Sequence, residues 1–120
     1  MRSILVLFIF VWFAGPGSAQ DFSLRDGDVV FDTARMQMDV VGQTHEFFDG
    51  GRAFFSISGS YSYTYPDGGV AYGNYEVRDG GVVCTRFNHG FSRCDVYVEN
   101  AGRWLLINEA GDRFPVRSQS

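Results

Sequence analysis

The chain has 120 residues, of which 45% are hydrophobic and 17% aromatic, and its formal net charge is −4. Fourteen acidic residues accompany ten arginines, and the sequence contains no lysine. Phosphate contacts require a clustered positive surface, so an acidic chain with scattered arginines argues against nucleic acid and against anionic membranes as partners.

The start of the chain has the pattern of a secretory signal peptide. One basic residue precedes an eleven-residue run without polar side chains, Ile4–Ala14, and the small residues Gly17 and Ala19 stand at the −3 and −1 positions of a cleavage site. The run is shorter than the roughly 18 apolar residues that a membrane-spanning helix needs. We expect a signal peptide at 1–19, a mature domain at 20–120, export to the periplasm or the medium, and no stable membrane anchor after cleavage.

The mature region has the pattern of one all-β domain. Short alternating segments recur at about ten-residue spacing between glycine-rich turns, and helical periodicity is almost absent. This favours a single antiparallel β-meander, either a barrel or a calycin-like half-barrel. Pro115 cannot donate to a strand ladder, so its segment is expected at a sheet edge or a strand end. Strands are expected at Thr44–Phe48, Arg52–Ser58, Ser60–Tyr65, Val70–Val77, Val82–Phe87, Phe91–Val98, Arg103–Asn108 and Arg113–Val116.

Residues 33–41 allow two interpretations. Apolar and polar residues alternate along them with a period of two, which favours a strand. A short helix capped by Asp32 or Thr33 is the alternative.

The two cysteines, Cys84 and Cys94, predict a disulfide across a hairpin. If they lie directly opposite each other, three residues remain for the loop, Asn88, His89 and Gly90. A three-residue hairpin needs a left-handed residue at its third loop position, which glycine adopts without strain. Facing strand positions bring the sulfurs within bonding reach, and closing this loop should stabilise the fold by roughly 2–3 kcal/mol.

A second hairpin is expected to bring several tyrosines together. A four-residue loop at Pro66–Gly69 pairs Tyr63 with Tyr72 and places four tyrosines on one face. Asn74 and Glu76 share that face, so we expect it to point outward as a possible binding surface. If it points inward, the same residues line a small cavity. In either orientation, the alternative is a purely structural role, in which the tyrosines stabilise the sheet as cross-strand pairs. The four tyrosines are Tyr61, Tyr63, Tyr65 and Tyr72.

No catalytic or metal-binding arrangement stands out. His45 is expected on a strand and His89 on a turn, and neither spacing supports a hydrolytic triad. Two cysteines and two histidines are too few for a plausible zinc site once a disulfide forms. Arg93 and Asp95, two apart on one strand face, are expected to form a surface ion pair of little energetic value. We therefore expect no enzyme activity, no cofactor and no metal.

Three segments carry a resemblance. The strand Gly73-x-Tyr75-x-Val77, the run Gly80–Cys84 and the closing segment Arg93–Val98 resemble small exported proteobacterial β-proteins of uncharacterised function. The resemblance covers residues 43–117. It implies a half-barrel or calycin-like meander and no activity.

The expected function is a binding or envelope-structural module that contacts a protein through the aromatic strand face. One alternative is a lipocalin-like carrier of a small apolar ligand, with a pocket lined by Phe47, Phe54 or Met36. Another is a periplasmic protease inhibitor, whose inhibitory N-terminal segment would be Gln20–Arg25. An exposed tyrosine face favours the protein-binding module, and an enclosed pocket favours the carrier.

Overall fold

The computed structural model describes residues 22–120, and the predicted signal peptide at 1–19 lies outside this range. The described part contains nine strands and one helix. In chain order these are β1 (Val29–Val30), α1 (Thr33–Asp39), β2 (Thr44–Phe47), β3 (Arg52–Phe55), β4 (Ser60–Thr64), β5 (Val70–Arg78), β6 (Val82–Phe87), β7 (Ser92–Asn100), β8 (Arg103–Asn108) and β9 (Arg113–Gln119).

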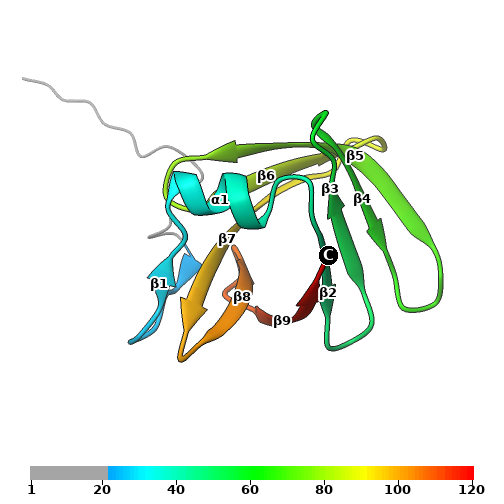
Figure 1. Ribbon diagram of the computed structural model, residues 1–120. Helices are drawn as coiled ribbons and strands as arrows, with labels where there is room; N and C mark the ends of the chain where they lie inside the picture. The colour runs from blue at the N-terminus through cyan, green and yellow to red at the C-terminus, as the bar shows by residue number, and fades with distance from the viewer. Residues whose placement is uncertain (1–21) are drawn as a thin grey trace, which may run out of the picture.

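The strands form an antiparallel barrel, as the turn pattern predicted. Each strand from β2 to β9 pairs with its neighbour in sequence, and β9 also pairs with β2, which closes a ring of eight (Figure 1). The short strand β1 is an addition, paired with the end of β7 through Val29↔Glu99 and Val30↔Val98. The fold is therefore all-β, with a closed barrel rather than a half-barrel.

Helix α1 corrects the expectation of a strand at residues 33–41. The carboxylate of Asp32 accepts a hydrogen bond of 2.8 Å from the backbone N–H of Arg35 and so caps the helix. Met36 and Val40, four residues apart, are both fully buried in the barrel core, whereas Met38 is 69% exposed. The alternation was thus a coincidence within a helical spacing, and α1 lies across one end of the barrel (Figure 1).

Strand β9 corrects the expectation for Pro115. Pro115 pairs with Leu105 of β8, and the next residue, Val116, pairs with Phe47 of β2. The strand is therefore neither at an edge nor at its end when it reaches the proline. The missing N–H falls where β9 changes from one neighbour to the other, beside a register shift in its pairing with β2.

The cysteine hairpin has the predicted register. Cys84 pairs with Cys94, their sulfurs are bonded, and their Cα atoms lie 4.0 Å apart. The N–H of Gly90 donates to the carbonyl of Phe87 at 2.9 Å, and Gly90 adopts a φ of +103°. The three-residue loop and its glycine are confirmed. A structural disulfide indicates an oxidising, exported environment.

Removing this disulfide should lower the free energy of unfolding by about 2–3 kcal/mol, because the unfolded chain regains the freedom of the closed loop. Urea unfolding of a Cys84→Ala/Cys94→Ala double variant measures the effect. Wild-type protein reduced by a phosphine is the matched control, and it should lose the same stability. A double variant as stable as the oxidised protein would contradict the structural role.

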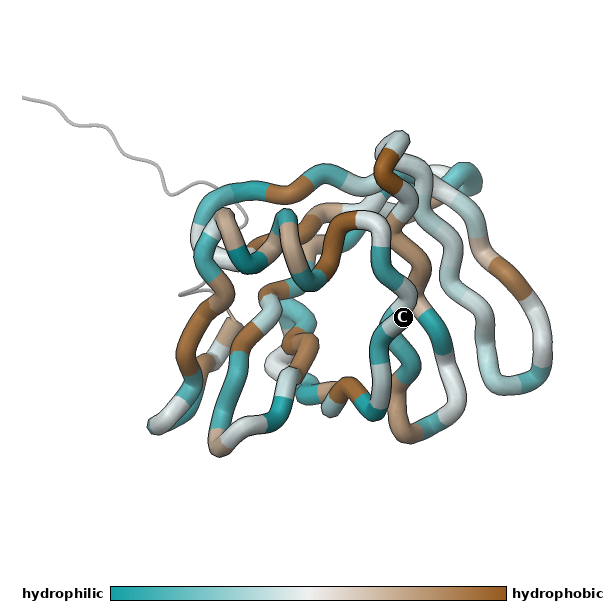
Figure 2. Tube along the Cα trace, viewed as in Figure 1, coloured by the Kyte–Doolittle hydropathy of each residue, from teal (hydrophilic) through white to brown (hydrophobic). Residues whose placement is uncertain are grey.

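Apolar side chains pack in two places. Short hydrophobic and hydrophilic stretches alternate along much of the trace, as expected of strands with two different faces (Figure 2). The larger cluster fills the barrel and includes Phe31 and Met36 from the N-terminal part of the domain. A smaller cluster lies on the outer face of β6, β7 and β8 and comprises Phe22, Val82, Val96, Val98, Leu105 and Ile107.

Candidate functional site: the open end of the barrel

The barrel has two unlike ends. Helix α1 covers the end where β3, β5 and β7 finish, with Met36 inserted in the core. The four hairpins β2–β3, β4–β5, β6–β7 and β8–β9 all turn at the opposite end. No helix of residues 22–120 covers this second end, which we call the mouth.

A cavity of about 170 Å³ lies at the mouth, and we call it the mouth pocket. Every second strand of the barrel contributes an apolar side chain to its wall. Tyr63 and Tyr65 meet edge to face, with ring centroids 5.0 Å apart. The apolar and aromatic lining consists of Phe47, Tyr63, Tyr65, Phe87, Leu106 and Phe114.

An ion pair forms the polar part of the lining. The Nε of Arg93 donates to an oxygen of Asp95 at 3.1 Å, and Asn108 lies opposite Asp95 on β8. The side chain of Asp95 is only 4% exposed, whereas that of Arg93 is 34% exposed. Both side chains line the cavity, and Arg93 is the more exposed of the two.

This pair corrects the sequence interpretation of Arg93 and Asp95 as a surface pair. Residues alternate between faces along β7, and Cys94 between them points to the outer face. The next inward residue of the strand is Tyr97, which is fully buried. The two charged side chains therefore point into the barrel.

Burial controls the protonation of this part of the lining. Desolvation raises the pKa of Asp95 to about 6, although Arg93 beside it acts in the opposite direction and Glu109 acts in the same one. Burial likewise raises the pKa of the Tyr61 hydroxyl far above its usual value. The lining thus holds a carboxyl group that changes between charged and neutral in weakly acidic solution.

The tyrosine hairpin has a different register from the one expected. Thr64, not Tyr65, pairs with Val70, and Tyr63 pairs with Ala71. The loop has three residues rather than four, because the N–H of Tyr65 donates to the carbonyl of Gly69 at 2.8 Å. Gly68 takes the left-handed position with a φ of +96°. A register shift of one residue moves a side chain to the opposite face of its strand pair.

The four tyrosines consequently do not share one outer face. Tyr61 is 4% exposed inside the barrel, and Tyr63 points into the mouth pocket. Tyr65 stands at the rim, 48% exposed, and Tyr72 lies on the outer face, 60% exposed. The expectation of an outward face was therefore wrong for the inner tyrosines.

The residues suggested for a carrier pocket also separate. Phe47 lines the mouth pocket. Met36 belongs to the core beneath α1, and Phe54 lies on the outer face, 41% exposed. One of the three suggested residues therefore reaches the cavity.

Both histidines have structural partners. His45 is fully buried on β2, its Nδ1 lies 2.7 Å from the hydroxyl of Tyr97, and its Nε2 lies 2.8 Å from the carbonyl of Asp39. A carbonyl can only accept, so Nε2 carries the proton and Nδ1 accepts from the tyrosine. Burial lowers the pKa of His45 and so favours the neutral ring. His89, at the tip of the cysteine hairpin, accepts the backbone N–H of Phe91 at 3.3 Å.

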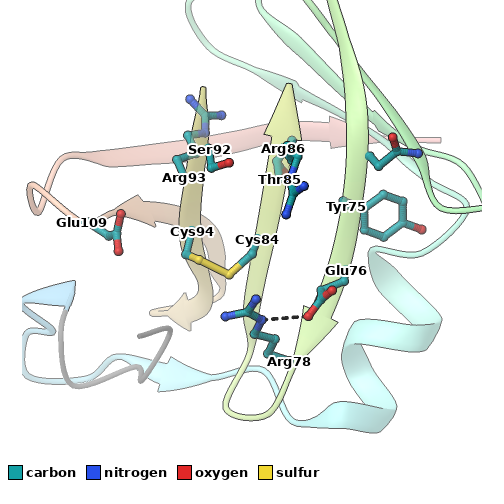
Figure 3. Close-up of a pocket in the computed structure, with 11 residues that line it drawn as sticks. Tyr75, Glu76, Arg78, Cys84, Thr85, Arg86, Ser92, Arg93, Cys94 and Glu109 are labelled. Atoms are coloured by element: carbon teal, nitrogen blue, oxygen red, sulfur yellow. Dashed lines mark hydrogen bonds and ion pairs between the residues drawn. A yellow bond between two sulfur atoms is a disulfide. The ribbon is translucent and has the colours of Figure 1, made fainter. Parts of the chain in front are cut away.

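A larger concavity of about 520 Å³ lies on the outer face of β5, β6 and β7 (Figure 3). The disulfide lies across it. An ion pair between Arg78 and Glu76 lies along one side, with 3.0 Å between Nε of Arg78 and Oε2 of Glu76. These two side chains are 41% and 66% exposed. A shallow surface lined by solvated charges removes little of a ligand from water, so the mouth pocket is the better candidate despite its smaller volume.

Comparisons with protein-family models, with curated proteins and with solved structures find no match for this chain. Within residues 22–120, no helix combines the length and the apolar character needed to cross a bilayer. In the same range, no three His, Cys, Asp or Glu side chains gather as a metal site.

Proposed function

We propose that this domain binds a small molecule with an apolar or aromatic body, which enters the mouth pocket. The observation that carries the proposal is the inward position of Tyr63, which places an aromatic wall around a cavity instead of an aromatic patch on the surface. The expectation of a protein-binding face depended on four tyrosines pointing outward. Their division between the two faces supports the carrier alternative.

The cavity sets the size of the ligand. An apolar cavity of about 150 Å³ holds one benzene molecule, whereas pockets for drug-sized ligands measure about 300–1,000 Å³. At about 170 Å³, the mouth pocket suits a single ring or the end of a longer apolar molecule. Aromatic side chains at the wall, such as Tyr63 and Phe87, would contact a bound ring edge to face or by stacking.

The disulfide also supports a place of action outside the cytoplasm. We propose that the mature domain works in the periplasm or in the medium after removal of residues 1–19. A ligand taken from such a compartment would be small enough to diffuse there.

Binding of benzyl alcohol, followed by nuclear magnetic resonance of the mature domain, tests the proposal. Millimolar benzyl alcohol should shift the resonances of Tyr63, Phe87 and Phe114 and leave the outer face unchanged. Phe114→Ala should weaken binding by about 2–10-fold, because an aromatic contact is worth about 0.5–1.5 kcal/mol.

Phe54→Ala is the matched control, since Phe54 and Phe114 are strand phenylalanines with similar exposure, 41% and 37%. Of these two residues, Phe114 lines the cavity and Phe54 does not. Shifts confined to the outer face around Phe54 and Tyr72, or no shifts at any concentration, would overturn the proposal. The first of these outcomes would favour a surface that binds a protein.

A further inference from the structure

We propose, on the basis of the ligand site in the mouth pocket, that the ligand carries a carboxylate or an equivalent anionic group and that the guanidinium of Arg93 binds it. The ligand class is then an aromatic or short aliphatic acid. Its apolar body would contact the aromatic wall, and its acidic group would lie against β7.

The first argument is the direction in which Arg93 can still form hydrogen bonds. A guanidinium has five N–H donors; the ion pair with Asp95 uses the one on Nε, and the hydroxyl of Tyr61 accepts another. Among residues 22–120, Asp95 is the only carboxylate within ion-pair distance of Arg93. The terminal nitrogens therefore keep three N–H donors for an acidic group, and arginine can bind a carboxylate through two of them.

The second argument is the order of the two charges. Both side chains line the cavity, and Arg93 is 34% exposed whereas Asp95 is almost completely covered. A cationic ligand would meet the guanidinium before it reached the carboxylate, and the two positive charges would repel. An anionic ligand meets an opposite charge first. Because the more exposed of the two groups is the cation, the pair favours a ligand with a negative charge.

The third argument concerns the charge balance when a second carboxylate arrives. Arg93 alone cannot neutralise both Asp95 and the ligand. Burial raises the pKa of Asp95, and Glu109 adds to this effect, so a proton on Asp95 can compensate for the incoming anion. The hydroxyls of Tyr61 and Tyr63, which also lie near Arg93, stay neutral because burial raises their pKa values.

The test compares phenylacetate with phenylacetamide, which has almost the same shape but no charge. Wild-type protein should bind phenylacetate at least about 10-fold more tightly, as expected when hydrogen bonds to a charged group replace neutral ones. Arg93→Gln should remove this preference and leave the affinity for phenylacetamide nearly unchanged. Arg86→Gln, on the exposed outer face of the adjoining strand, is the control and should preserve the preference.

Equal affinities of the wild-type protein for the two compounds would overturn the inference and leave the proposed function standing. If neither compound nor benzyl alcohol binds, the proposed function itself fails. The ratio measured on the wild-type protein decides the question even if Arg93→Gln does not fold. Loss of the preference in Arg86→Gln would place the acidic group on the outer face and also overturn the inference.

Discussion

Replacing Asp28 with alanine should destabilise the domain by about 3–5 kcal/mol, the usual cost of removing one partner from a buried ion pair. The side chain of Asp28 is 0% exposed, and that of Arg113 is 12% exposed. Both terminal nitrogens of Arg113 donate to the carboxylate, at 2.7 and 3.0 Å. Asn100 and the backbone N–H of Arg25 also donate to it, at 2.8 and 2.7 Å.

The contact is important because it joins three distant parts of the chain. Asp28 stands just before β1, Asn100 ends β7, and Arg113 begins β9. Alanine at position 28 leaves the guanidinium of Arg113 partly buried without its counter-ion. A charge left in this state costs much more than the net value of the pair.

Urea unfolding of Asp28→Ala, Arg113→Ala and the double variant measures the effect. The double variant should lose less stability than the two single variants combined, since neither charge remains alone. Arg78→Ala removes an exposed pair with a similar distance of 3.0 Å and should cost less than about 1 kcal/mol. Strict additivity, or an equally small effect of Asp28→Ala, would contradict the role assigned to this contact.

The same contact predicts part of the acid sensitivity of the fold. The hydrogen bonds from Arg113 hold the pKa of Asp28 well below its usual range. The folded state therefore gains stability from an ionised Asp28 above about pH 4, and this contribution is lost as the pH falls below that value.

The sequence predicted the β architecture because its turns are locally encoded. The three-residue turn derived for Gly90 recurs at Gly50, Gly59, Gly68 and Gly111. In each, the glycine N–H donates to the carbonyl of the residue three positions earlier. One rule therefore applies to five hairpins. The cysteines fixed the register of one of them, whereas the tyrosine hairpin had no such constraint. Choosing a four-residue loop there grouped Tyr61 and Tyr63 with Tyr72 on one outer face, although only Tyr72 of these three points outward.

The direction of the strand faces was harder to predict, because apolar residues occupy both faces of β6, β7 and β8. Val83 and Tyr97 point into the barrel, while Val82 and Val96 pack outside beneath Phe22. With apolar residues on each side, alternation alone does not distinguish the inner face. The inward position of Arg93 and Asp95 depends on this choice.

Two other features lay beyond local patterns. Asp28 and Arg113 are 85 residues apart, and nothing in the sequence near either residue indicates the other. The spacing of Met36 and Val40 fits a helix, yet the alternating residues around them fit a strand equally well. The segment forms a helix, because Asp32 caps its first turn and because Met36 and Val40 can then both pack into the core at this end of the barrel.

Asp95→Asn should change the pH dependence of stability in the opposite sense to the loss of Asp28. Burial raises the pKa of folded Asp95 from 3.8 to about 6, so the folded state binds this proton more tightly than the unfolded chain does. Between about pH 4 and pH 6 the folded group is protonated and the unfolded one is ionised. Asp95 therefore contributes stability that is fully present below about pH 4 and is lost as the pH rises to about 6.

His45 has the opposite effect over an overlapping range. Burial lowers its pKa, so below about pH 6.5 the unfolded state binds a proton at this residue more readily than the folded state does. The contribution of His45 is therefore lost as the pH falls. His45 and Asp95 therefore change the stability of the wild-type protein in opposite directions in this range.

The difference between wild-type protein and Asp95→Asn isolates the carboxyl group, because His45 is present in both. Relative to wild type, the free energy of unfolding of the variant should increase by about 2 kcal/mol from pH 4 to pH 6, since each pKa unit is worth about 1.4 kcal/mol and the titrations are only partly complete at these two limits. Urea unfolding at half-unit pH steps measures it, with Asp79→Asn, at an exposed turn residue, as the control for loss of a charge. A wild-type–variant difference that stays constant with pH would show that Asp95 is ionised throughout this range, and the proton that balances a bound anion beside Arg93 would then have to come from another group.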